Sequence, residues 1–191
     1  MIFGITGGSG CGKTTALLAV KDLGGLVLDC DQIYHRLLEE SPALLAAISR
    51  RFPGVVTEAG LERKKLGSIV FTEKSALMDL NRIAHRVVKE AVLEALEERQ
   101  PPLAAIDAIA LFEGGLAELC DYTVAVTAPR EARIARLMAR EGISREYAES
   151  RLNAQHPDAY FQEKCDFVLE NAGTKEDFYE KARSLFSGLI G

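Results

Sequence analysis

The sequence is poor in residues that mark several special classes of protein. Its 191 residues include no tryptophan and only four cysteines, which lie far apart and form no C-x-x-C pair. Neither a zinc site nor a disulfide framework is therefore indicated, and we interpret Cys11, Cys30, Cys120 and Cys165 as free thiols. No run of about 18 uncharged apolar residues is present, and no basic, apolar leader opens the chain. We expect a cytoplasmic protein without a membrane partner.

An excess of positive charge is also missing. The chain has 23 lysines and arginines against 28 aspartates and glutamates, which gives a net charge of −5. This balance argues against a protein that binds nucleic acid through its phosphates, so we expect no nucleic-acid partner. With 48% hydrophobic residues the composition is that of an ordinary globular protein, and we expect a monomer or a small homo-oligomer.

Short apolar runs separated by helical periodicity predict the fold class. The runs are Ile2 to Thr6, Leu26 to Cys30, Leu103 to Ala108, Tyr122 to Thr127 and Phe167 to Glu170. Continuous apolar strands that alternate with helices are typical of a parallel sheet covered on both faces, which is α/β organisation. We therefore predict a core of residues 1–34 and 100–191.

Two excursions from this core are helical. The long gap between the second and third runs predicts an insert over residues 35–99, whose longest helical pattern runs from about Glu73 to Arg99 and stops at Pro101-Pro102. A second excursion, at about residues 130–156, begins after Pro129 and is broken at Gly142 before Ser144 caps a further helix. We expect this second segment to act as a small helical lid.

A glycine-rich segment lies between the first strand and the next helical pattern. Residues Gly7 to Thr14 read G-G-S-G-C-G-K-T and fit the pattern G-x-x-x-x-G-K-[ST]. Without Cβ atoms the backbone can wrap a polyphosphate, while consecutive N–H groups and a helix N-terminus attract its oxygens. Lys13 adds a positive charge at the β- and γ-phosphates, and the Thr14 hydroxyl suits Mg²⁺. The alternative is a glycine-rich turn that only starts a helix.

This pattern predicts binding of ATP and Mg²⁺ by a three-layer P-loop NTPase fold, with a parallel five-stranded sheet, a helical substrate-binding insert and the lid. Asp29 and Asp31 follow the second apolar run, near the edge where parallel sheets bind ligands. We favour Asp31 as the group that orients an acceptor hydroxyl and takes its proton, while Asp29 reaches Mg²⁺ through water. The alternative is that Asp31 only caps a helix that starts near Gln32. Asp107 resembles a Walker B aspartate at the end of a strand, but the apolar residues Ala108 to Phe112 continue past it, so its role stays open.

Three arginines fall on one stripe of the predicted lid helix. Arg133, Arg136 and Arg140 stand at i, i+3 and i+7. Either this stripe is a solvated basic face, or its guanidiniums close on the phosphates of ATP, and we favour Arg136 and Arg140 for that second role.

The order of these motifs resembles the dephospho-coenzyme A kinase family over about residues 3 to 185. Asp29-Cys30-Asp31-Gln32-Ile33 is similar to the family's D-A-D-x-I, and the P-loop is similar to its phosphate-binding loop. Further similarities lie at Gly60 to Arg63, Leu66 to Phe71, Ile83 to His85, Leu111 to Glu113, Arg136 to Arg140, Gln155 and Asp166 to Gly173.

The resemblance implies transfer of the γ-phosphate of ATP to the ribose 3′-hydroxyl of dephospho-coenzyme A. It implies a catalytic set of Asp31, Lys13 and Arg140, and a metal-binding hydroxyl on Thr14. The implied nucleotide-binding residues are Gly8, Gly10, Cys11, Gly12, Lys13, Thr14, Thr15, Arg136, Asn171 and Gly173. The implied acceptor-binding residues are Asp31, His35, Arg63, His85 and Phe112. The alternative is a P-loop kinase for another small acceptor, such as a nucleoside monophosphate or a shikimate-like acid.

The sequence departs from the family pattern at four positions. His35 stands where the family has arginine, although Arg36 is adjacent, and Arg86 and Ile109 stand where it has proline. Arg133 replaces a glutamine three residues before the first lid arginine. Most of these changes fall on the expected acceptor side and therefore bear on acceptor specificity.

Overall fold

The structure is a computed structural model that describes residues 1–191, and it divides the chain into two compact units. The first unit contains residues Met1–Leu28, Pro101–Phe112 and Leu116–Gly191. The second unit contains Asp29–Gln100 together with Glu113–Gly115. No helix in either unit is both long enough and apolar enough to span a membrane.

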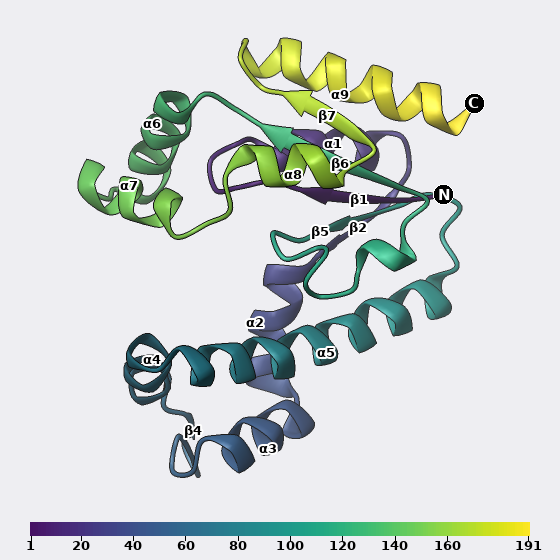
Figure 1. Ribbon diagram of the computed structural model, residues 1–191. Coiled ribbons are helices and arrows are strands. Elements are labelled where there is room, and N and C mark those ends of the chain that lie inside the picture. The colour runs from purple at the N-terminus through teal and green to yellow at the C-terminus, as the bar shows by residue number, and fades with distance from the viewer. The chain divides into compact units, whose positions relative to one another are not determined.

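The first unit is built on a five-stranded sheet (Figure 1). The strands are β1 (Ile2–Thr6), β2 (Leu26–Asp29), β5 (Ala104–Asp107), β6 (Tyr122–Thr127) and β7 (Phe167–Glu170), and their order is β2-β5-β1-β6-β7. Strand β1 pairs in parallel with β5 and β6, and β6 pairs in parallel with β7. Strands β1 and β6 are buried on both faces, which is why each was visible as a continuous apolar run, whereas β7 has exposed residues. The predicted parallel five-stranded sheet is confirmed.

Both faces of this sheet are covered. Phe3 and Ile5 of β1 are fully buried in a cluster that includes side chains of α1 (Lys13–Asp22) and α9 (Lys175–Ile190). On the opposite face Gly4 leaves room for Leu111 and Cys120, because a Cβ at Gly4 would lie 2.8 Å from the Cys120 sulfur. Helix α8 (Asp158–Lys164) packs against β6 (Figure 1). The result is a three-layer arrangement.

Two further helices of the first unit form a small cluster of their own. Helix α6 (Arg130–Glu141) packs on α7 (Arg145–Asn153), with Ile134, Leu137, Ala148 and Leu152 buried between them. Gly142 ends α6 with a φ of 65°, and the Ser144 hydroxyl caps α7 by accepting the Tyr147 N–H. The helices predicted on either side of Gly142 are therefore confirmed. A short 3₁₀ helix, Ala117–Leu119, precedes β6.

The second unit is mainly helical. It contains α2 (Cys30–Glu40), α3 (Pro42–Arg51), the two-residue strands β3 (Val56–Thr57) and β4 (Gly60–Leu61), α4 (Arg63–Thr72) and α5 (Lys74–Arg99). Helices α2, α3 and α4 all pack on α5 (Figure 1). Their core is aliphatic except for one buried phenylalanine, and its fully buried members are Leu44, Ile48, Val55 and Ala76. This unit therefore has a hydrophobic core that is its own.

Candidate active site

The loop between β1 and α1 has the backbone geometry of an anion cradle. Gly7, Gly10 and Gly12 have φ values of 139°, 77° and 103°, a region that side chains with a Cβ rarely enter. A Cβ at Gly7 would also lie 2.2 Å from the Val126 carbonyl oxygen, and one at Gly12 would lie 2.2 Å from the Asn171 amide nitrogen. Only glycine fits these positions, and the loop leads directly into the positive N-terminus of α1.

Lys13 brings a full positive charge into this loop. Its Nζ donates to the Gly7 carbonyl at 3.0 Å and lies 4.0 Å from Asp107 Oδ1. Asp107 ends β5 and is paired in register with Ile5 of β1, so the sheet itself delivers this carboxylate to the start of the loop. The lysine and aspartate side chains are only 14% and 15% exposed, which strengthens their attraction. The structure thus places Asp107, whose role the sequence left open, beside Lys13.

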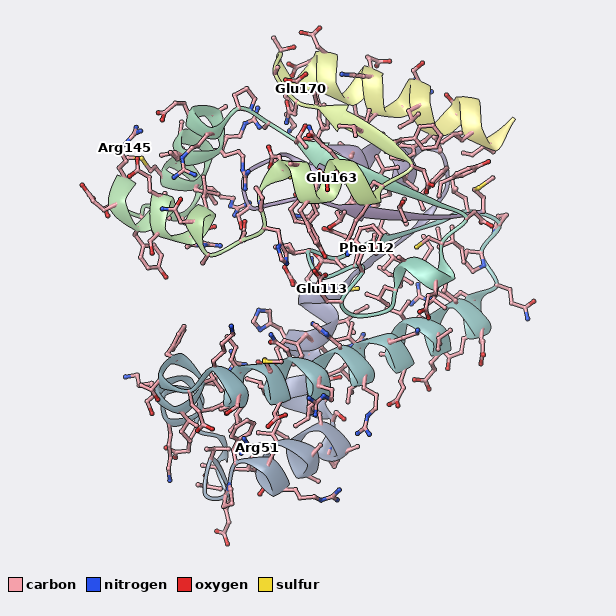
Figure 2. The ribbon with its side chains drawn as sticks, viewed as in Figure 1. Arg51, Phe112, Glu113, Arg145, Glu163 and Glu170 are labelled. Carbon is pink, nitrogen blue, oxygen red and sulfur yellow. The ribbon has the colours of Figure 1, made fainter.

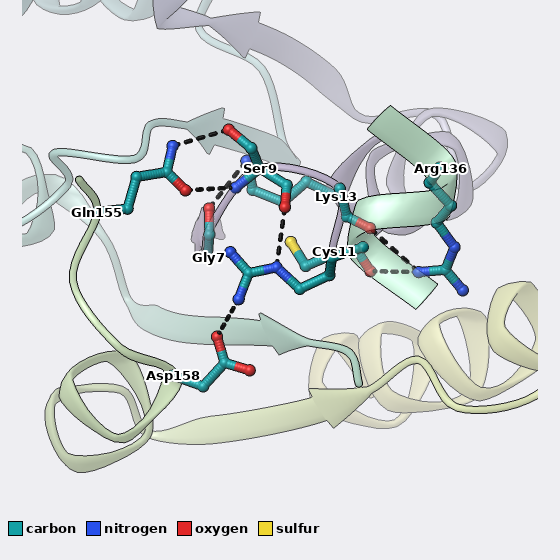
Figure 3. A network of polar contacts seen from close by, with 9 residues as sticks. Gly7, Ser9, Cys11, Lys13, Arg136, Gln155 and Asp158 are labelled. Atoms are coloured by element: carbon teal, nitrogen blue, oxygen red, sulfur yellow. Dashed lines mark hydrogen bonds and ion pairs between the residues drawn. The ribbon is translucent and has the colours of Figure 1, made fainter. Parts of the chain in front are cut away.

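The carbonyl side of the loop is held by side chains from distant segments (Figure 3). Arg136 donates to the carbonyl oxygens of Gly10 and Cys11 at 3.1 and 3.4 Å, and to Asn171 Oδ1 at 3.2 Å. Asn171, which is buried just after β7, also donates to the Cys11 carbonyl at 2.9 Å. These bonds occupy the loop's carbonyl groups.

Ser9 is bound by a glutamine that lies far away in sequence. Gln155 Oε1 accepts the Ser9 N–H at 2.8 Å, and its Nε2 donates to the Ser9 hydroxyl at 2.7 Å (Figure 3). Sequence reasoning noted Gln155 only as part of the family resemblance and did not assign it or Ser9 to the site. The contact depends on how the segment before α8 returns to the loop, and no local sequence pattern predicts this return.

The arginine stripe of α6 is divided between two environments. Arg133 is only 7% exposed and donates to the Ser9 carbonyl, and Arg136 is half-buried on the loop, so the alternative of a solvated basic face is wrong for both. The Arg140 side chain is 60% exposed and pairs with Glu141 at 2.5 Å. The structure does not bring Arg140 to the phosphate loop, and its role as a lid residue stays a prediction.

Cys11 lies inside the loop but is not prepared for thiol chemistry. Burial raises the pKa of its thiol, although the positive charge of Lys13 opposes that shift. The side chain therefore stays a protonated thiol at neutral pH. It serves to fill space behind Gly7, and all four cysteines are free thiols as predicted.

The aspartate that ends β2, Asp29, and the one in the first turn of α2, Asp31, have different roles in the structure. Asp29 caps α2, because its carboxylate accepts the Gln32 backbone N–H at 3.0 Å and the Gln32 side-chain amide at 2.8 Å. The alternative that Asp31 is the cap is therefore wrong. Asp31 lies in the first turn of α2 with an exposed side chain.

The remaining predicted residues fall in separate places. His35 is exposed on α2, Arg63 begins α4 and pairs with Glu39 at 3.5 Å, and His85 is half-buried on α5, all in the second unit. Phe112, which is labelled in Figure 2, belongs to the first unit. The Lys164 ammonium lies 5.1 Å from the centre of its ring.

The nucleotide-side predictions stay closer together. Thr14 is exposed and Thr15 half-buried in the first turn of α1, and Gly173 lies in the segment between β7 and α9. The Thr15 N–H donates to the Gly12 carbonyl at 3.0 Å, which starts the helix at the end of the cradle.

Comparison with known proteins decides the family. The model of the dephospho-CoA kinase family matches residues 1–177. The chain belongs to the dephospho-CoA kinase family. A dephospho-CoA kinase of Anaeromyxobacter dehalogenans is 37% identical over 195 residues, which cover 100% of this chain and 92% of the relative.

Solved structures agree with this membership. A crystal structure of a Thermus thermophilus protein has a TM-score of 0.83 and 34% identity, and the match covers 100% of this kinase and 98% of that chain. A shikimate kinase of Bacteroides thetaiotaomicron has a TM-score of 0.56 at 15% identity, covering 100% and 98% of the two chains, and shows likeness of fold alone. The protein is thus a P-loop kinase that phosphorylates dephospho-CoA at the expense of ATP, and another small acceptor is not favoured.

Proposed function

We propose that the first unit binds ATP with Mg²⁺ in the Gly7–Gly12 loop, and that Asp31 accepts a proton from the ribose 3′-hydroxyl of dephospho-CoA as the γ-phosphate is transferred. The observation that carries the proposal is the loop itself, whose left-handed glycines and buried Lys13 form a positively charged cradle at the start of α1. Family membership supports the choice of acceptor.

The nucleotide's phosphates are proposed to contact the loop's N–H groups and the first turn of α1. Gly8, Gly10 and Gly12 allow the backbone to approach, while Cys11, Thr14 and Thr15 are proposed to line the same phosphate site. Lys13 exchanges its bond to the Gly7 carbonyl for the β- and γ-phosphates. Arg136, which already contacts the Gly10 and Cys11 carbonyls of the loop, is proposed to bind the phosphates, and Asn171 and Gly173 are proposed to lie next to the adenine.

The donor set near the cradle fits Mg²⁺. This ion prefers oxygen ligands and keeps several waters, so it needs only one or two protein groups beside the phosphates. The Thr14 hydroxyl is exposed in the first turn of α1, and the Asp107 carboxylate is near Lys13. No group of three or more histidine, cysteine or acidic side chains is placed to hold a metal ion. When bound, Mg²⁺ would neutralise phosphate charge, with Thr14 as direct ligand and Asp107 as a partner of its waters.

On the acceptor side Asp31 is the proposed general base. It is exposed and is not used as a helix cap, so its carboxylate can accept a proton from a bound hydroxyl. His35 lies one helical turn after Asp31 on α2 and is proposed to bind the same acceptor. Arg63, His85 and Phe112 complete the proposed acceptor-binding set.

The segment from about residue 130 to 156 is the proposed lid. Its Arg140 is paired with Glu141 at the surface, where an ion pair contributes little to stability. Arg140 can therefore exchange this partner for the transferring phosphate at small cost. We place the activity in the cytoplasm and expect a monomer or a small homo-oligomer that binds neither nucleic acid nor membrane.

A direct assay tests this function. The purified full chain is given ATP and Mg²⁺ with dephospho-CoA, a nucleoside monophosphate or shikimate, and ADP release is measured for each. We expect ADP release with dephospho-CoA, and the product should be coenzyme A by mass. Activity only with another acceptor would overturn the acceptor assignment, and failure to bind ATP or ADP would overturn the site.

A further inference from the structure

We infer that Arg133 and Asp158 form a brace that positions the phosphate loop of this chain for nucleotide binding. Arg133 lies on α6 and Asp158 is the first residue of α8. The inference rests on the proposed function only in taking a nucleoside polyphosphate as the loop's ligand.

The Arg133 guanidinium joins the phosphate loop to α8 through two of its nitrogens. Its Nε donates to the Ser9 carbonyl at 2.9 Å, and its Nη1 donates to Asp158 Oδ1 at 2.8 Å (Figure 3). The Arg133 side chain is 8% exposed and that of Asp158 is 29% exposed. A guanidinium presents its donors in a fixed planar fork, whereas a lysine ammonium is a point charge on a flexible stem. The position of α8 and the orientation of the Ser9 carbonyl are thereby linked.

The backbone of the loop also lies in direct contact with Arg133. A Cβ at Gly8 would lie 2.1 Å from Arg133 Nη2, and a Cβ at Gly10 would lie 2.8 Å from the Arg133 carbonyl oxygen. Glycines at these two positions therefore let the loop lie directly against residue 133. Any displacement of this side chain changes the path that the loop can take.

Holding the Ser9 carbonyl fixes the next N–H group. The Ser9 C=O and the Gly10 N–H belong to one planar trans peptide and point in opposite directions. With the Ser9 oxygen bound to Arg133, the Gly10 N–H is fixed on the side away from the guanidinium. Backbone N–H groups of such a loop hold the phosphates, so the brace sets the direction of one proposed phosphate donor before the nucleotide arrives.

The charge of Asp158 is needed because Arg133 is buried. A buried ion pair is costly to break, since removal of one partner leaves the other charge without compensation in a medium of low dielectric constant. Replacement of Asp158 by asparagine keeps the shape of the side chain and an acceptor oxygen but removes the charge. The guanidinium would then be held less firmly, and the Ser9 carbonyl with it.

Calorimetric titration of the full chain with ADP and Mg²⁺ tests the brace. We expect Arg133→Gln, which removes the charge and the planar donor fork, to weaken ADP binding about tenfold or more, and Asp158→Asn to weaken it about fivefold. Arg133→Lys should not restore the affinity, because it cannot bond both partners in the same geometry. The titration is done well below the unfolding temperature of each variant, so that every variant is folded. If the two residues contributed only to folding stability, ADP affinity would therefore be unchanged.

The double variant and a surface control make the test decisive. In the double variant the affinity should stay within about twofold of Arg133→Gln, whereas a loss equal to the product of the two single losses would overturn the pairing. Arg82→Gln removes an exposed ion pair with Asp79 on α5, in the second unit, and should not change ADP affinity. A folded Arg133→Gln variant with the wild-type ADP affinity would overturn the inference. If Arg133→Gln does not fold, a wild-type ADP affinity of Asp158→Asn would overturn it instead. A wild-type chain that binds no ADP would instead overturn the proposed function.

Discussion

At the residue scale, Lys13 and Asp31 carry opposite charges in the proposed reaction, and their variants separate binding from chemistry. We expect Lys13→Ala to lower the rate at least about 100-fold and to weaken ADP binding, because it removes the cradle's positive side chain. Asp31→Asn should lower the rate at least about 100-fold by removal of the base. It should leave ADP affinity within about twofold of the wild type, because Asp31 belongs to α2 and not to the phosphate loop.

Steady-state rates with dephospho-CoA and calorimetry with ADP measure both quantities. Lys21→Ala, on the last turn of the same α1, and Glu40→Gln, at the end of the same α2, are the matched controls and should keep the wild-type rate. An Asp31→Asn enzyme with a nearly normal rate would show that this aspartate is not the base.

Single residues were predictable where the chemistry is local in sequence. The glycines of the loop, Lys13 and Thr14 follow one another within eight positions, so spacing alone placed them. Arg133 and Asp158 were not predictable as a pair, because their contact depends on the approach of α6 and α8 to the loop. A stripe of arginines at helical spacing says nothing about which of them is buried.

At the element scale, the buried strands were the most predictable part of the fold. The apolar runs at Ile2–Thr6, Tyr122–Thr127 and Phe167–Glu170 coincide with β1, β6 and β7. Strands β1 and β6 are buried on both faces, and such strands are apolar along their whole length. The strand order was not predictable, since neighbouring strands are distant in sequence. The hairpin of β3 and β4 was missed because strands of two residues carry no periodicity.

The link between β6 and β7 depends on pH. Asp166, just before β7, accepts the Thr123 N–H at 2.7 Å and the Thr123 hydroxyl at 2.8 Å on β6. These bonds, the backbone one first, lower the pKa of Asp166 below its ordinary value of 3.8. A group whose pKa is lowered by folding stabilises the protein above its unfolded pKa, and that contribution is lost as the pH falls through the folded pKa. The contribution is therefore fully present at neutral pH and is lost progressively as the pH falls below about 4.

Thermal unfolding across pH tests this link. We expect Asp166→Asn to unfold at a lower temperature than the wild type at pH 7, and the difference to shrink as the pH is lowered toward about 3, because the wild-type carboxylate loses its contribution as the pH falls through its lowered pKa. Glu163→Gln, an exposed change on α8, is the control for loss of one negative charge. If the unfolding temperatures of wild type and Asp166→Asn differed by the same amount at pH 7 and at about pH 3, the assignment would be contradicted.

At the scale of the whole molecule, each of the two units has a hydrophobic core of its own. The phosphate loop, Lys13 and the side chains that hold the loop all belong to the first unit. Asp31, His35, Arg63 and His85 belong to the second. We therefore expect a change in the core of the second unit to alter stability without altering nucleotide affinity.

Ile48→Val is suited to test this separation, because Ile48 is fully buried in the second unit and the change removes one methyl group. It should destabilise the protein by about 1 kcal/mol and lower the unfolding temperature by about 2–4 °C. ADP affinity should stay within about twofold of the wild type, so ADP at about 100 times its dissociation constant should add the same stability, about 2.7 kcal/mol, to both proteins. Calorimetric titration and thermal unfolding with and without ADP measure these quantities. A tenfold loss of ADP affinity in Ile48→Val would show instead that the core of the second unit helps to shape the nucleotide site.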